Sequence, residues 1–203
     1  SNGLPLKNGI RDRSIANAIP DWMGSITNTF TYKNLRLNFL IDHRQGGTVI
    51  SVTDAMLNYE GVSEATLAGR EGGLIFGKNL FPGMSAVKED GTPNDIAVDA
   101  QTFWRGIGGV GNPVSEAFVQ SMTNTRLREV MLGYTLPKSM IAKLPVSGIQ
   151  LSLVGRNLLY ISRASKSLDA DIYSGTGVAS EGQSVFAPPT TRTYGLDLKI
   201  NFK

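Results

Sequence analysis

Apolar and polar residues alternate with a period of two in five segments, at residues 22–32, 35–42, 129–136, 149–160 and 194–203. Because successive side chains of a β-strand point to opposite faces, this alternation predicts strands with one apolar and one polar face. The last segment is the clearest, because Asp197, Lys199 and Asn201 are among its polar positions. Its apolar positions are Tyr194, Leu196, Leu198, Ile200 and Phe202.

The segments are long for strands of a soluble protein. Each has roughly ten residues, whereas soluble strands average about five or six and a tilted strand needs about nine to eleven to cross a membrane. A strand of a soluble β-sandwich alternates in the same way, with its apolar face turned toward the second sheet. The period alone therefore leaves both a membrane barrel and a soluble sandwich open.

The connections between the segments alternate between short and long. Residues 33–34 and 137–147 form short links, whereas residues 45–125 and 162–191 form long ones. Outer-membrane barrels have short periplasmic turns and long extracellular loops, so this order favours a barrel. Within the first long connection, residues 49–59 have the apolar spacing of a short helix, and the glycine-rich stretch 106–111 is expected to be a flexible loop.

Composition narrows the function. The chain is 41% hydrophobic and 18% charged, carries a formal net charge of +3, and has no basic run, which argues against binding to nucleic acid. It contains no cysteine, so disulfides and thiolate chemistry are excluded. Residues 1–20 lack the features of an export signal, from which we expect the chain to be part of a longer protein.

Several motifs resemble those of SusC/RagA-type outer-membrane proteins. Residues 126–137 (RLREVMLGYTLP) are similar to the family's RLREVSLGYTLP segment, and residues 155–160 (GRNLLY) to its GRNLF motif. Further similarities occur in family order at residues 17–22, 27–34, 42–47 and 191–196. Two departures are the run 167–171, which replaces a GLDPE-like turn, and a chain end in which the aromatic residue Phe202 is penultimate.

The resemblance implies an all-β fold: about five C-terminal strands of a transmembrane antiparallel β-barrel with two long extracellular loops. Residues 1–203 would form the C-terminal part of a TonB-dependent receptor barrel, without the plug domain and the N-terminal region. The resemblance also implies a Gram-negative, Bacteroidetes-like outer membrane as the location, and import of glycans, peptides or similar nutrients as the function. The alternatives are a secreted soluble β-sandwich that binds carbohydrate and, less favoured, a hydrolytic enzyme.

The implied partners follow from the same resemblance. They are the remainder of the barrel and its plug, outer-membrane lipid, a SusD-like surface lipoprotein, a glycan or peptide substrate, and the TonB complex through the missing N-terminal part. No cofactor is expected.

Aromatic residues in the long connection are candidates for substrate binding, because aromatic side chains often anchor ligands and partners. The alternative is that they pack the loop on itself, and the sequence does not separate the two. These residues are Tyr59, Phe81, Phe103, Trp104 and Phe118.

Charged residues on the strands are expected in the barrel lumen. Arg36, Asp42 and Arg44 share the polar face of their segment, where pairing among them is favoured over lining a substrate path. By simple alternation, Arg126 and Arg128 fall on the apolar face of theirs, at the outer end of the strand.

No residue set predicts catalysis or metal binding. His43 is the single histidine, so neither a catalytic triad nor a multi-histidine metal site is available. Asp169, Asp171 and Asp197 lack the spacing of a calcium loop and are expected to be solvated acids. We therefore expect a protein that is not an enzyme, with no catalytic or metal-binding residues.

Overall fold

The computed structural model describes residues 2–7, 14–78, 86–111, 113–169, 171 and 182–203. The chain forms two compact units, which are treated separately below. The sheet unit comprises Ile19–Gly47, Ser121–Ile172 and Pro188–Lys203, and the loop unit comprises Ser1–Ala18, Thr48–Gln120 and Tyr173–Ala187. Strand accounts for 43% of the described residues and helix for 16%, so the expected β fold is confirmed.

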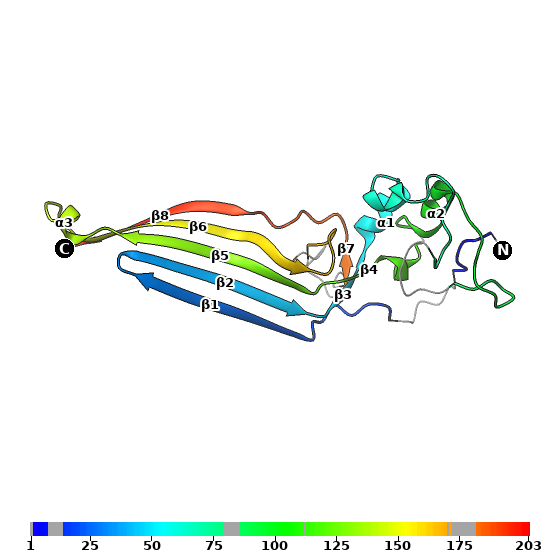
Figure 1. The fold of residues 1–203 in the computed structure, drawn as a ribbon, viewed down its shortest axis with the longest axis horizontal. Helices are drawn as coiled ribbons and strands as arrows, with labels where there is room; N and C mark the ends of the chain where they lie inside the picture. Colours follow the sequence, from blue (N-terminus) through cyan, green and yellow to red (C-terminus); the bar gives the residue numbers. More distant parts are fainter. Residues whose placement is uncertain (1, 8–13, 79–85, 112, 170, 172–181) are drawn as a thin grey trace. The chain divides into compact units, whose positions relative to one another are not determined.

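The sheet unit consists of five antiparallel strands in the order β1-β2-β5-β6-β8 (Figure 1). Each strand pairs with the one that follows it in this order. The strands are β1 (Trp22–Tyr32), β2 (Leu35–Gln45), β5 (Asn124–Thr135), β6 (Val146–Arg163) and β8 (Thr193–Phe202). Each overlaps one of the five alternating segments, although β5 begins five residues earlier than predicted and β6 is longer than predicted, with 18 residues.

The short connections lie together at one end of these strands. Lys33 adopts a positive φ of 52° in the two-residue turn between β1 and β2, where a hairpin needs left-handed backbone. The turn between β5 and β6 contains a short helix, α3 (Lys138–Ile141), whose Ile141 is buried. The two long connections begin and end at the opposite end of the sheet, as the alternation of connection lengths predicted.

The strand register aligns the apolar positions into rows that cross the whole sheet. Leu196, at the end of one such row, is 74% exposed. One row contains Phe30, Leu37, Leu132, Leu153 and Leu196. The next contains Tyr32, Leu35, Tyr134, Leu151 and Leu198.

The opposite face is polar. One of its rows contains Thr31, Arg36, Gly133, Ser152 and Asp197. The described part of the sheet unit is therefore a single sheet with one apolar and one polar face. A β-sandwich would instead place a second sheet against the apolar face.

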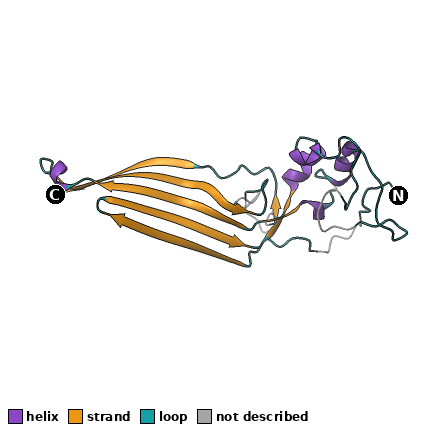
Figure 2. Ribbon diagram, viewed as in Figure 1, coloured by secondary structure: helices purple, strands orange, loops and turns teal. Residues whose placement is uncertain are grey.

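The loop unit contains short helices and a small sheet (Figure 2). Its helices are α1 (Val52–Tyr59), η1 (Glu64–Leu67), α2 (Ala100–Ile107) and η2 (Ser115–Phe118). Its sheet has the order β4-β3-β7, formed by β4 (Val119–Ser121), β3 (Thr48–Ser51) and β7 (Gln183–Ser184). No helix in the described residues is long and apolar enough to cross a membrane.

Two side-chain caps fix where the main helices begin. The Ser51 hydroxyl accepts a hydrogen bond from the Asp54 amide at 3.1 Å, and the Asp99 carboxylate accepts one from the Thr102 amide at 2.9 Å. Such caps satisfy amides that the first helical turn leaves without partners. Helix α1 confirms the predicted helix for residues 52–59, whereas residues 49–51 belong to strand β3. Helix α2 ends at Ile107, so the first two residues of the stretch 106–111 are helical and not part of a flexible loop.

The loop unit has its own hydrophobic core. Its members include Ala55, Leu74, Val98, Phe103, Trp104, Ile107 and Phe118. Phe103 and Trp104 meet edge to face, with ring centroids 5.3 Å apart at 83°. This geometry is favourable for aromatic pairs and adds to the burial of both rings. The long connection is thus a folded unit with a core of its own.

Candidate functional site

A β-bulge in β5 sets the geometry of the main polar site. Leu40 of β2 lies opposite Glu129, but the next residue, Ile41, lies opposite Leu127, so Arg128 is an extra residue in β5. A bulge of one residue reverses which face the following side chains occupy. Arg126 therefore lies opposite Asp42, on the polar face of the sheet. The prediction that Arg126 and Arg128 share the apolar face is wrong, because simple alternation does not continue through the bulge.

Strand β6 carries matching irregularities. Its register against β5 shifts on both sides of Leu159, and Asn157 adopts a positive φ of 52° there. Asparagine tolerates this left-handed conformation better than most residues. The shifts place Tyr160 opposite Arg126, and they explain why the alternation of the fourth segment weakens after residue 153.

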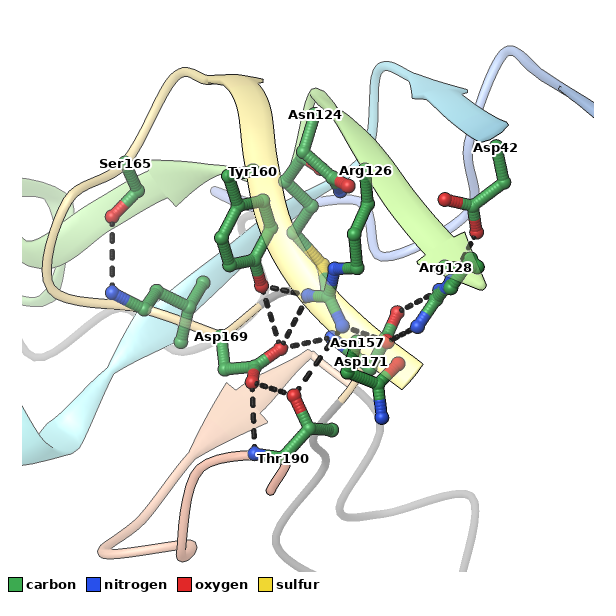
Figure 3. A network of polar contacts seen from close by, with 12 residues as sticks. Asp42, Asn124, Arg126, Arg128, Asn157, Tyr160, Ser165, Asp169, Asp171 and Thr190 are labelled. Atoms are coloured by element: carbon green, nitrogen blue, oxygen red, sulfur yellow. Dashed lines mark hydrogen bonds and ion pairs between the residues drawn. The ribbon is translucent and has the colours of Figure 1, made fainter. Parts of the chain in front are cut away.

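Arg126 is the centre of a network of charged and polar contacts (Figure 3). Its side chain is only 2% exposed. The guanidinium donates to Asp169 Oδ1 at 2.8 Å and to Asp171 Oδ2 at 2.5 Å, and it also donates to the Tyr160 hydroxyl. It lies over the Tyr160 ring, 4.1 Å from the centroid. A buried guanidinium is tolerated because two carboxylates and an aromatic face surround it.

Asp169 is the most heavily bonded acid of this network. It accepts hydrogen bonds from the Thr190 amide at 2.9 Å, the Thr190 hydroxyl at 2.6 Å and the Tyr160 hydroxyl at 2.8 Å. Burial alone would raise the pKa of Asp169, but the bonds from Thr190 and the charge of Arg126 outweigh it and lower the pKa below its ordinary value. Asp169 is thus ionised at neutral pH.

Arg128 extends the network to a further strand. Its Nε donates to Asp42 Oδ2 at 2.6 Å, and its terminal nitrogens donate to both oxygens of Asp171. Two arginines therefore share Asp171, and the network joins strands β2, β5 and β6 to the connection that leads to β8. The expectation that Asp169 and Asp171 are solvated acids is wrong, because both are partners of arginine.

The predicted lumen residues do share the polar face, but they do not pair with one another as expected. The partner of Asp42 is Arg128, whereas Arg36 is exposed and lies opposite Gly133. Arg44 is partly buried and lies opposite Asn124. A role for these residues on a substrate path remains a prediction.

Four of the five candidate aromatic residues are described, and they lie in the core of the loop unit or at its margin. Phe103, Trp104 and Phe118 are between 0% and 3% exposed, so they offer no free ring face and instead stabilise the core. Tyr59 is half-buried, with the Arg105 guanidinium 5.7 Å from its ring centroid. Phe81 lies outside the described residues.

Residues at the margin of the core line a pocket of about 360 Å³. Tyr59 and Trp104 contribute to its wall, together with Arg70 and Gln101. Binding of substrate by Tyr59 at this pocket stays a prediction.

His43 occupies a strand end, as predicted. One ring nitrogen contacts the Thr125 hydroxyl at 2.8 Å, and the ring lies 4.7 Å from that of Trp22. Within the part of the chain that the structure describes, no group of three or more acidic, histidine or cysteine side chains is arranged to hold a metal ion.

The sequence of the chain is similar to that of a known receptor. No protein-family model matches the chain. The chain is 25% identical over 192 residues to "TonB-dependent receptor P26" of Formosa agariphila, a match that covers 93% of this chain and 18% of the relative. The chain thus spans less than a fifth of this relative's length.

Solved structures of a RagAB peptide importer share the fold. The 'closed-closed' state matches with a TM-score of 0.59 and 18% identity, over 94% of this chain and 18% of the importer chain. The 'open-open' state matches with the same score and identity, over 91% and 17%. These relatives are a receptor and an importer, which agrees with the prediction that the chain is not an enzyme. As its motifs predicted, the chain is homologous to one segment of a TonB-dependent receptor, and it has the fold of a part of the RagAB importer.

Proposed function

We propose that residues 1–203 form the C-terminal barrel wall and extracellular loops of a SusC/RagA-like transporter in the outer membrane. The plug and the segment that contacts TonB would belong to other parts of the parent protein. The proposal rests mainly on one observation: the apolar positions of five neighbouring strands line up into exposed rows on one face. Lipid covers such a face in a membrane barrel, where every backbone polar group between strands is also paired.

The polar face then lines the interior of the barrel. It carries the network around Arg126 at the end of the sheet where the long connections begin. In this arrangement the network fixes the connection between β6 and β8 at the mouth of the barrel. The loop unit, with its own core, would be extracellular, where it meets substrate and a SusD-like surface lipoprotein.

The imported substrate belongs to the class of glycans, peptides or similar nutrients. The RagAB protein that shares this fold is a peptide importer, which supports peptides as the substrate. Energy for import would come from the TonB complex. A Gram-negative, Bacteroidetes-like host is proposed on the family resemblance.

The test begins with the parent protein in its own cells, carrying an affinity tag. We expect it in the outer-membrane fraction, and a surface lipoprotein should be purified together with it. Deletion of its gene should abolish growth on one nutrient class, peptides or glycans, while growth on free amino acids or monosaccharides continues. Recovery in the soluble periplasmic or secreted fraction would contradict the proposal and favour a carbohydrate-binding sandwich.

A further inference from the structure

A basic cavity adjoins the network around Arg126 in the sheet unit. It has a volume of about 430 Å³ and lies between the end of β6 and the two ends of the connection to β8. Among the described residues, its charged lining comprises Arg126, Arg163, Lys166, Arg192 and one acid, Asp169. These residues bring four positive charges and one negative charge to the cavity wall.

Most of this positive charge is not neutralised within the described residues. Arg126 is paired with Asp169 and Asp171. Arg163, Lys166 and Arg192 are exposed and form no ion pair with any acid in the described ranges. Three cations around one hollow repel one another, and an anion bound between them relieves this repulsion.

Two features position the cavity wall before any ligand arrives. The Tyr160 ring has the Arg126 guanidinium 4.1 Å and the Arg163 guanidinium 5.2 Å from its centroid, so this aromatic ring orients both. The Asn157 side chain donates to the Thr191 carbonyl at 3.2 Å and so connects β6 to the segment that carries Arg192. A pre-positioned guanidinium loses less conformational freedom on binding, which favours affinity.

We propose that this cavity binds the carboxylate of an anionic solute: the chain end or acidic side chain of a peptide, or the uronate of an acidic glycan. Arginine favours carboxylates because its planar fork matches both carboxylate oxygens. The inference rests on the proposed function, because Arg126 and Tyr160 lie on the polar face that would line the barrel interior. A solute passing the mouth of the barrel reaches this face, and membrane lipid does not.

The test uses the purified parent protein and calorimetric titration with two matched pairs of probes. One pair is N-acetylated penta-alanine with a free carboxylate and the same peptide as an amide. The other is trigalacturonate and its methyl ester. We expect the acid of at least one pair to bind about tenfold more tightly than its neutral twin. This is the gain in affinity expected when the carboxylate forms two partly exposed ion pairs with cations of the cavity. The preference should decrease as salt is added.

Variants identify the site. The double substitution Lys166→Gln and Arg192→Gln removes two cations that the network around Arg126 does not use, so it should abolish the preference. Lys199→Gln removes an exposed cation from the same polar face outside the cavity and should leave the preference unchanged. Discrimination within the peptide pair alone, or within the glycan pair alone, supports the proposal and identifies the source of the carboxylate. Equal binding of acid and neutral probes, or a preference that persists in the double variant, would overturn it.

Nutrient uptake by cells separates this inference from the proposed function. If the parent protein imports no nutrient but still prefers the acid probe, the proposed function fails and the binding site stands. If it imports nutrients but binds acid and neutral probes equally, the transporter stands and the binding site fails.

Discussion

Replacing Asp169 with asparagine removes the carboxylate that neutralises a buried charge. Asp169 Oδ1 lies 2.8 Å from the guanidinium of Arg126, whose side chain is 2% exposed, while that of Asp169 is 13% exposed. Asparagine has a similar volume and keeps an oxygen acceptor, but it carries no charge. The substitution thus tests the charge at this position with little change in packing.

The expected cost follows from the burial of the pair. Breaking one partner of a buried ion pair costs about 3–5 kcal/mol, because the remaining charge is left uncompensated. Asp171 continues to pair with Arg126, so the lower end applies, about 3 kcal/mol. If the opening is local, this corresponds to an increase of about a hundredfold in the open fraction of the connection between β6 and β8.

Hydrogen exchange of the parent protein in detergent or lipid measures this opening. The Thr190 amide donates directly to Asp169, so its exchange should accelerate most, together with amides near residues 165–169. Asp197→Asn is the matched control, because Asp197 is exposed on β8 and forms no ion pair within the described residues. Equal exchange at Thr190 in the Asp169 variant and in wild type would refute the reasoning, and so would an equal effect of the control.

Three further outcomes are expected. Leu132→Arg, in the middle of an exposed apolar row, should impair assembly of the barrel by about 2–4 kcal/mol, whereas Thr29→Arg on the polar face should assemble normally, as measured by the yield of folded protein in lipid vesicles. The folded pKa of Asp169 is lowered from 3.8, so its contribution to stability is complete above pH 3.8 and is lost as the pH falls through the folded pKa. Cleavage by pepsin near residue 169 should therefore rise in wild type as the pH falls below about 3.8. The asparagine variant should lack this pH dependence. Phe103→Ala should destabilise the loop unit by about 3–5 kcal/mol, because the ring is fully buried, and thermal unfolding with proteolysis of residues 52–107 would measure this loss.

Much of the sheet could be predicted because the alternation of side chains along each strand depends on neighbouring residues in the sequence. A period of two specifies which side chains share a face, and the alternation of connection lengths specifies which strands are neighbours. The rows through Leu37 and Leu132 follow once each strand is placed next to its predicted partner. The turn at residues 33–34 and the helix within 49–59 also depend on neighbouring residues alone.

The polar network could not be predicted in the same way, because it depends on a bulge. One signal was present: Leu127 is apolar at an odd position, whereas Val130 and Leu132 are apolar at even positions, so the alternation changes phase between residues 127 and 130. A change of phase indicates an inserted residue. Asp169 lies 43 positions from Arg126, and no local pattern joins them.

The core of the loop unit escaped prediction for a different reason. Its members are scattered from Ala55 to Phe118 without a regular period, so the aromatic residues among them looked equally suited to binding and to packing. Only the tertiary arrangement shows that Phe103 and Trp104 face inward. Asp99 is a typical helix-capping residue, so the start of α2 could be predicted from the local sequence. The glycine-rich stretch at its end instead favoured a loop.

The most direct test of the account is a scan of β8 in the parent protein with single spin labels, one at each position from 193 to 202, in lipid vesicles. Residues 1–203 contain no cysteine, and any cysteine elsewhere in the parent protein is replaced by serine before labelling. If the apolar face contacts lipid, labels at 194, 196, 198 and 200 will be accessible to oxygen dissolved in the bilayer, and labels at the positions between them will not. Loss of this period of two, or protection of the even positions from both oxygen and water-soluble reagents, would contradict the account and show that protein covers the apolar face.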